Sequence, residues 1–149
     1  MPHAVTPQID PKFARYRLRV GRSPVHRYGV FALEEIPRGR LVIEYTGKRL
    51  TYDQAQKIRP PKDAYVATVS DRWLVDARIG GSGAEFINHS CNPNLSWRRI
   101  RGHLFYFSRK KIRVGEELTG RYGYPTKIRR MPCHCGAPRC KGTLRLILL

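Results

Sequence analysis

Residues 88–94 read Asn-His-Ser-Cys-Asn-Pro-Asn and gather amides, an imidazole, a hydroxyl and a thiol around one proline. This segment is too polar and too rich in turn-forming residues to be ordinary core. A second block, residues 116–124, reads Glu-Glu-Leu-Thr-Gly-Arg-Tyr-Gly-Tyr, and a compact cysteine cluster follows it. The first block is therefore a candidate site for binding or catalysis.

The four cysteines are Cys91, Cys133, Cys135 and Cys140, and the last three crowd into eight residues near the end of the sequence. No secretory leader precedes them, which argues against a disulfide framework, and zinc prefers thiolates in closed four-coordinate structural sites. Three thiolates from the tail need a fourth ligand, which can be Cys91 or, as a nitrogen ligand, His134. The pattern predicts one structural zinc ion, and cysteines without a metal are the alternative.

Charge is the strongest signal in the composition. Lys and Arg number 29 against 11 Asp and Glu, a formal net charge of +18. No carboxylate side chain occurs in residues 86–115 or in residues 118–149, and both stretches hold basic clusters: Arg98, Arg99 and Arg101; Arg109, Lys110, Lys111 and Arg113; Lys127, Arg129 and Arg130. Such a field attracts phosphate backbones. Nucleic acid is therefore a candidate partner, and a solvated basic face is the alternative.

The length of 149 residues suits one domain, and 41% of the residues are hydrophobic. No apolar run approaches the roughly 18–20 residues that span a bilayer, and no charged and then apolar leader begins the sequence. We expect a soluble intracellular protein with no membrane partner, as a monomer or homodimer. In a microbe it would be cytoplasmic or nucleoid-associated, and the nucleus is an alternative.

Short β-rich segments punctuated by turns dominate the chain and predict a mainly β fold. They cover residues 16–20, 28–32, 41–45, 65–69, 73–76, 95–100 and 104–107. One helix is expected after Thr51, which can form a capping box with Gln54, and it must end before Pro60. A further helical turn is expected near residues 84–88. Residues 1–12 carry three prolines and predict a flexible arm.

Taken in order, the motifs resemble the SET-domain protein lysine methyltransferases with a post-SET-like zinc tail. The matching segments are residues 26–32, 44–47, 75–77, 86–94 and 115–122, and then the cysteines. The resemblance covers about residues 16–144. It implies small curved sheets with short helices and a C-terminal pseudoknot in which the Asn-His segment and the Tyr122 segment cross. It also implies a SET domain over 13–125 and a zinc-binding tail over 126–149.

The implied activity is methyl transfer from S-adenosyl-L-methionine to a lysine amine of a protein partner. An in-line displacement of this kind needs alignment and a neutral amine, but no metal and no covalent intermediate. Free lysine has a pKa near 10.4, so an apolar channel or the nearby sulfonium must favour its neutral form. Tyrosines suit such a channel, because their rings form apolar walls and their hydroxyls supply oriented dipoles.

The resemblance also assigns roles to individual residues. The catalytic candidates are Tyr122 and Tyr45. The cofactor-binding candidates are Arg27, Tyr28, Gly29, Asn88, His89 and Tyr122. The substrate channel would include Tyr65, Trp97, Gly120 and Tyr124, and the metal ligands would be Cys91, Cys133, Cys135 and Cys140. For Tyr65 and Tyr124, filling of a sheet is an equal alternative.

The chain departs from the family pattern at several positions. Arg27 replaces a usual glycine, so either the loop has an ordinary backbone conformation or its cofactor contact is altered. Gly120 replaces a common aromatic residue and leaves space unless Trp97 or a neighbour fills it. Glu85 replaces a cation and Arg121 replaces an acid, so an ion pair between them is a hypothesis.

Two functions remain open from the sequence. The first is an active lysine methyltransferase that acts on a basic, nucleic-acid-associated protein. The second is a catalytically weak SET-like module that binds nucleic acid or a nucleic-acid-bound protein. The joint presence of Tyr45, Asn88, His89 and Tyr122 favours the enzyme, because a pure binding module needs none of them as a set.

Overall fold

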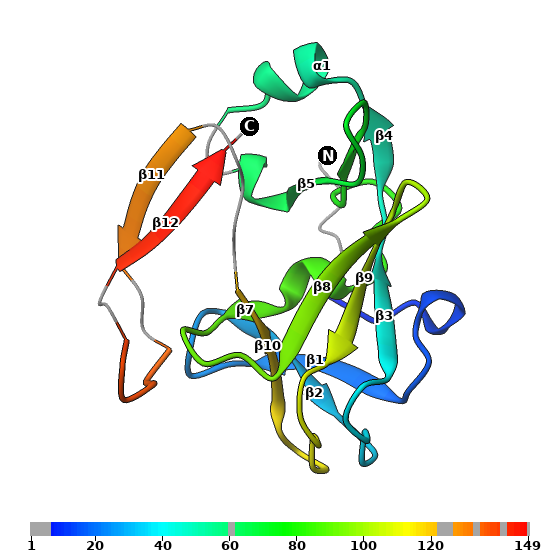
Figure 1. Cartoon of the computed structure of the whole chain (residues 1–149), viewed down its shortest axis with the longest axis vertical. Helices are drawn as coiled ribbons and strands as arrows, with labels where there is room; N and C mark the ends of the chain where they lie inside the picture. Colours follow the sequence, from blue (N-terminus) through cyan, green and yellow to red (C-terminus); the bar gives the residue numbers. More distant parts are fainter. Residues whose placement is uncertain (1–6, 60–61, 122–126, 133–134, 141–142, 149) are drawn as a thin grey trace.

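The structure is a computed structural model, and it describes residues 7–59, 62–121, 127–132, 135–140 and 143–148 (Figure 1). The strands are β1 (Leu18–Arg22), β2 (Tyr28–Ala32), β3 (Leu41–Tyr45), β4 (Lys48–Leu50), β5 (Val66–Thr68), β6 (Leu74–Asp76), β7 (Asn88–His89), β8 (Leu95–Ile100), β9 (His103–Ser108), β10 (Glu117–Gly120), β11 (Lys127–Pro132) and β12 (Thr143–Leu148). The helices are α1 (Tyr52–Gln56) and the 3₁₀ turns η1 (Pro11–Phe13), η2 (Lys62–Tyr65) and η3 (Ala84–Phe86). Within the described part of the chain, no helix is long and apolar enough to cross a membrane.

The strands form small separate sheets, as expected for the mainly β fold (Figure 1). Their orders are β1-β2-β10-β7, β3-β9-β8, β4-β6-β5 and β11-β12. Most pairs are antiparallel, but β7 and β10 run parallel, with Thr119 opposite Asn88 and Gly120 opposite His89. Because β10 lies between β2 and β7, three segments far apart in sequence meet in one sheet. The parallel pairing of β7 with β10 is the part of the expected pseudoknot that the structure describes.

The main core lies between the sheet containing β2 and β10 and the sheet containing β3 and β9. Its fully buried side chains include Val30, Ile36, Val42, Ile43, Ile112 and Leu118. A smaller cluster of Leu50, Val66 and Leu74 lies beneath α1. Burial of this apolar surface is the main favourable term that holds the short strands together.

The predicted elements can be compared directly with the observed ones. The strands β2, β3 and β8 have the predicted bounds, while β1, β5, β6 and β9 shift by one or two residues. The capping box of Thr51 and Gln54 is confirmed, and α1 ends before Pro60. The short strand β4, with exposed Lys48 and Arg49, was missed because it lacks an alternating apolar pattern.

Part of the N-terminal arm contacts the core. The backbone N–H of Asp10 donates to the carbonyl of Ser82 at 2.8 Å, and Ile9 packs against the main core. The Asp10 side chain also accepts from the N–H of Lys12 at 3.0 Å and caps η1. These contacts hold residues 9–13 beside η3.

Candidate active site and metal centre

The side-chain amide of Asn88 links the two segments expected to recognise the cofactor. Asn88 is buried on β7, and its Nδ2 donates to the carbonyl oxygen of Tyr28 at 2.7 Å. The same nitrogen lies 3.2 Å from the carbonyl oxygen of His26 and 2.9 Å from Oε1 of Glu117. The loop before β2, the Asn-His segment and β10 therefore meet at one amide group.

Glu117 is a site residue to which the sequence analysis gave no role. Its carboxylate accepts from Oγ of Ser23 at 2.7 and 2.9 Å and from Asn88. A Cβ atom placed on Gly29 would lie 2.2 Å from Oε1 of Glu117, so any larger residue there would displace this carboxylate. Glu117 belongs to the block of residues 116–124 that the sequence analysis singled out. Nothing in the sequence, however, showed that its side chain points at Gly29.

Arg27 retains a backbone conformation that favours glycine. Its φ is +30°, in the left-handed region that L side chains rarely adopt, and its carbonyl accepts from the N–H of Ser23 at 3.1 Å. The alternative of an ordinary backbone conformation is therefore wrong. The arginine therefore adopts a left-handed conformation, with backbone strain at this residue.

Asn94 fixes the end of the Asn-His segment to β10. Its Nδ2 donates to the carbonyl of Glu117 at 2.9 Å, and its Oδ1 accepts from the N–H of Thr119 at 2.9 Å. Its backbone N–H also lies 3.3 Å from Oγ1 of Thr119. One buried amide thus pairs with the strand backbone and holds residues 88–94 next to β10.

Of the four tyrosines expected to act in catalysis or to line the lysine channel, the structure describes Tyr45 and Tyr65. Tyr45 is 5% exposed at the end of β3, and its hydroxyl donates to the carbonyl oxygen of Tyr65 at 2.8 Å. This bond brings two of the expected channel residues together. The other two, Tyr122 and Tyr124, lie outside the described residues.

The space beside Gly120 is filled by Tyr106, a residue that the sequence analysis missed. A Cβ atom on Gly120 would lie 3.0 Å from Cε1 of Tyr106 and 3.7 Å from its hydroxyl oxygen. Tyr106 comes from β9 and is 7% exposed. Trp97 instead donates from Nε1 to the carbonyl of Arg121 at 3.3 Å. A neighbouring aromatic side chain on another strand thus covers the glycine.

Burial changes the protonation of two side chains near the site. Burial, followed by the positive charge of Arg121, lowers the pKa of His89 to about 4, so the imidazole is neutral at neutral pH. Burial raises the pKa of Glu85 to about 7. The Glu85 carboxyl group accepts from the N–H of Gly83 at 3.0 Å, whereas Arg121 donates to the carbonyl of Cys91 at 3.0 Å. The hypothesis of a Glu85–Arg121 ion pair is wrong, because both groups have other partners.

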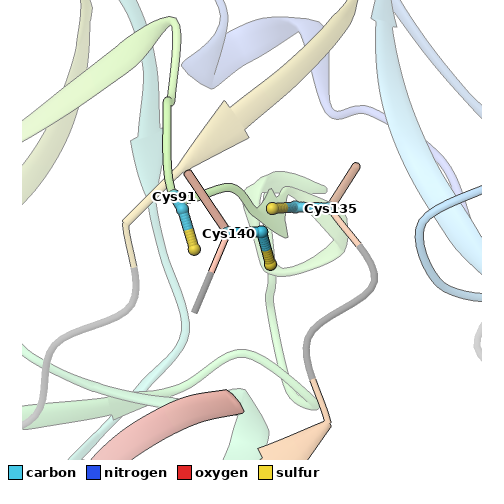
Figure 2. Close-up of side chains that lie close together, drawn as sticks. All are labelled: Cys91, Cys135 and Cys140. Carbon is cyan, nitrogen blue, oxygen red and sulfur yellow. The ribbon is translucent and has the colours of Figure 1, made fainter. Parts of the chain in front are cut away.

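Three of the four expected metal ligands come together (Figure 2). The Sγ atoms of Cys91, Cys135 and Cys140 all lie within 4.8 Å of one another, and all three residues are half-buried. Thiolates bound to one tetrahedral zinc ion are about 3.8 Å apart, so the cluster could hold a metal with small adjustments. The fourth expected ligand, Cys133, lies outside the described residues, as does His134, the alternative to Cys91.

The fold of small sheets, the Asn88 junction and the ordered motifs define a SET-domain protein. The family model of the SET domain matches residues 27–123, and the chain belongs to this family. It is 36% identical over 143 residues to "Histone-lysine N-methyltransferase SETD1B" of Xenopus tropicalis, with 89% of this chain and 7% of the relative covered.

Two further relatives have similar coverage. The chain is 34% identical over 143 residues to "Histone-lysine N-methyltransferase SETD1A" of Homo sapiens, with 89% of this chain and 8% of the relative covered. It is 34% identical over 144 residues to "Histone-lysine N-methyltransferase SETD1" of Drosophila melanogaster, with 89% and 9% covered. The chain therefore spans less than a tenth of the length of these curated relatives.

Proposed function

We propose that the chain is an S-adenosyl-L-methionine-dependent protein-lysine N-methyltransferase. The observation that carries the proposal is the junction at Asn88, where the loop before β2, β7 and β10 meet within a SET-domain fold. When bound, the cofactor supplies an electrophilic methyl group on a sulfonium. The residues of the chain must bind that group, orient the lysine amine and exclude water.

The junction has the chemistry of a site for a cationic ligand. The carbonyl oxygens of His26 and Tyr28 and the carboxylate of Glu117 are acceptors around the Asn88 amide. Because the pKa of His89 is low, its imidazole is neutral at neutral pH and adds no positive charge to the site. Acceptors and a carboxylate stabilise an ammonium or sulfonium group, and a neutral imidazole does not repel it. These groups fit the proposed cofactor.

The proposed lysine channel is built from tyrosines beside this junction. The Tyr45 hydroxyl is oriented by the carbonyl of Tyr65, which fixes one dipole at the end of β3. Tyr122 is proposed as the residue whose hydroxyl orients the reacting groups. Gly120 and Tyr124 complete the proposed channel, and the walls favour the neutral amine by excluding water.

The metal centre is proposed to be structural. A closed site of Cys91, Cys133, Cys135 and Cys140 would leave no open position for substrate. Such a zinc ion would fold the tail over 126–149 onto the SET domain of residues 13–125, because metal binding and folding are coupled. The tail would then complete one wall of the channel.

The proposed substrate is a lysine on a basic protein that associates with nucleic acid. The net charge of +18 supports proximity to nucleic acid, and the relatives are named as histone-lysine methyltransferases. An intracellular location is part of the proposal. The second candidate is a catalytically weak SET-like module that binds nucleic acid, and the replacement of glycine by Arg27 at the cofactor loop motivates it.

Calorimetric titration with S-adenosyl-L-methionine tests the proposal. We expect micromolar binding to the wild type and a loss of about tenfold or more in Asn88→Ala, because the Asn88 amide holds the loop before β2 and the charged Glu117 together, and hydrogen bonds to charged groups contribute about 1.5–3 kcal/mol. Asn92→Ala is the matched control, since Asn92 is an exposed amide in the same segment. No binding to a zinc-loaded wild type would favour the non-catalytic module.

A further inference from the structure

A pocket distinct from the Asn88 junction opens at the start of β8. Its volume is about 320 Å³, and its lining residues are Pro93, Leu95, Ser96, Trp97, Arg109 and Arg121. Strand β8 is the edge strand of its sheet, and β9 lies beside it (Figure 1). Two guanidinium groups and one indole thus share a surface pocket that contains no acidic side chain.

Backbone carbonyls hold the two arginines in place. Nη1 of Arg109 donates to the carbonyl oxygen of Pro93 at 3.3 Å, and Nη2 of Arg121 donates to that of Cys91 at 3.0 Å. In the described residues, the four side-chain ion pairs involve other cations. A guanidinium group has five N–H donors, so each arginine retains donors and its full charge for a ligand.

Trp97 gives the pocket an aromatic wall. Its side chain is 37% exposed, and its Nε1 donates to the carbonyl of Arg121, which fixes the ring beside that residue. The guanidinium of Arg99 lies 5.2 Å from the ring centroid. An exposed tryptophan held among cations can stack on a nucleobase, and such stacking tolerates any base because every base has a π-face.

Positive charge continues from the pocket along β8. Arg99 is exposed on the same face of β8 as Trp97, and Arg101 is exposed in the turn after β8. Arg98 points to the opposite face of the strand, where its guanidinium lies 4.8 Å from the ring centroid of Phe107. Residues 86–115 and 118–149, which supply the entire pocket, contain no carboxylate side chain. The surface therefore offers a series of cations rather than one isolated charge.

We propose that this pocket binds a phosphate group of single-stranded nucleic acid between Arg109 and Arg121, with a base on Trp97. The inference deepens the proposed association with nucleic acid and does not depend on methyl transfer. A polynucleotide repeats its negative charge and can contact both the pocket and Arg99, which lies on the same face of β8 as Trp97. A single acidic side chain of a protein would use only the pocket, so the continuous charge favours the polynucleotide.

Fluorescence anisotropy with a labelled short oligothymidylate tests the site. We expect Arg109→Gln and Arg121→Gln each to weaken binding about fivefold or more and to lower the slope of log K against log salt by about 1. Arg72→Gln is the matched control, because Arg72 is an exposed arginine in the turn between β5 and β6. It should weaken binding less than twofold. Circular dichroism and zinc content would establish that each variant is folded.

A second readout does not depend on the arginine variants. In a Trp73→Phe protein, Trp97 is the only tryptophan, and oligothymidylate should quench its fluorescence. The converse protein, Trp97→Phe, retains only Trp73 and should show little quenching. Equal quenching of both proteins would overturn the proposed position of the base.

Three outcomes would overturn the inference. The first is no binding by the wild type at low salt, and the second is equal loss in all three arginine variants, which would mean diffuse attraction. The third is displacement of the oligonucleotide by polyglutamate of equal charge at equal concentration, which would assign the pocket to acidic peptides. Calorimetric binding of S-adenosyl-L-methionine is measured on the same samples, so failure of this pocket and failure of the proposed enzyme are distinguishable.

Discussion

The Sγ atom of Cys91 lies 3.6 Å from Nε2 of His89. His89 is on β7 opposite Gly120, and Cys91 belongs to the thiol cluster of Figure 2. The proposed metal centre and the proposed cofactor site therefore touch through two side chains only two residues apart. Loss of the metal should therefore weaken cofactor binding through the contact between Cys91 and His89.

The first prediction concerns this connection. Cys135→Ser should release zinc and weaken both S-adenosyl-L-methionine binding and methyl transfer, because a structural site needs all four ligands. The body of the domain over residues 16–121 should remain folded. Metal analysis should find about one zinc ion per wild-type chain, and calorimetry would report cofactor affinity.

Cys91→Ser separates the alternatives for the ligand set. If Cys91 is a ligand, this variant should lose zinc as Cys135→Ser does. Retention of zinc without Cys91 would point to His134 as a ligand and would contradict the link between the tail and β7.

The second prediction uses the positive φ of Arg27. Arg27→Gly should raise the free energy of unfolding by about 0.5–1 kcal/mol, because relief of left-handed strain exceeds the entropy cost of glycine. Arg27→Ala is the control, since it removes the same long side chain but retains Cβ. Urea unfolding of both variants measures the difference. An alanine variant more stable than the glycine variant would show that the backbone at residue 27 is unstrained.

The third prediction concerns the packing of Gly120 against Tyr106. Gly120→Phe should destabilise the protein by about 1–3 kcal/mol through overpacking, because its Cβ would already lie 3.0 Å from the Tyr106 ring. Tyr106→Ala makes room for the new ring, so the double variant should be more stable than the sum of the two single effects by 1 kcal/mol or more, on the order expected for contacting residues. Strict additivity in the denaturant series would mean that Tyr106 does not fill this space.

The fourth prediction concerns pH and Glu85. Its pKa is raised to about 7 by burial, so the folded state holds a proton that the unfolded state releases above the ordinary carboxyl pKa. The contribution to stability is fully present below about pH 4.5 and is lost as pH rises through 7. Glu85→Gln stays neutral and can still accept from Gly83. The stability of the variant relative to wild type should therefore rise by about 2 kcal/mol between pH 5 and pH 8. A constant difference in denaturant unfolding across that range would contradict the raised pKa.

Local patterns were sufficient for many elements of the fold. The bounds of β2 and β3 follow from dense β-branched and aromatic residues, and α1 follows from the capping box at Thr51. The ordered motifs also predicted the family, which the match over residues 27–123 bears out. The proximity of Cys91 to Cys135 and Cys140 agrees with the ligand set expected from the thiol count.

The missed features depend on contacts between distant strands. Nothing local shows that Tyr106 on β9 covers Gly120 on β10, or that Glu117 points at Gly29. The Glu85–Arg121 hypothesis failed because charge reversal in sequence does not fix distance, and the Arg121 side chain donates to Cys91 instead. Such tertiary contacts are set by how the sheets pack, which periodicity cannot supply.

Methyl transfer by Tyr122→Phe tests the central claim most directly. Mass spectrometry would detect methylated lysine in a panel of basic nucleic-acid-binding proteins offered as substrates. Tyr52→Phe is the matched control, because it removes a tyrosine hydroxyl on α1, away from the proposed site. We predict lysine methylation by the wild type and Tyr52→Phe, and a rate lower by about 10²-fold or more in Tyr122→Phe with unchanged cofactor affinity. Activity of Tyr122→Phe within about threefold of wild type would contradict its assignment, and no lysine methylation by a wild type that binds zinc and cofactor would contradict the enzyme itself.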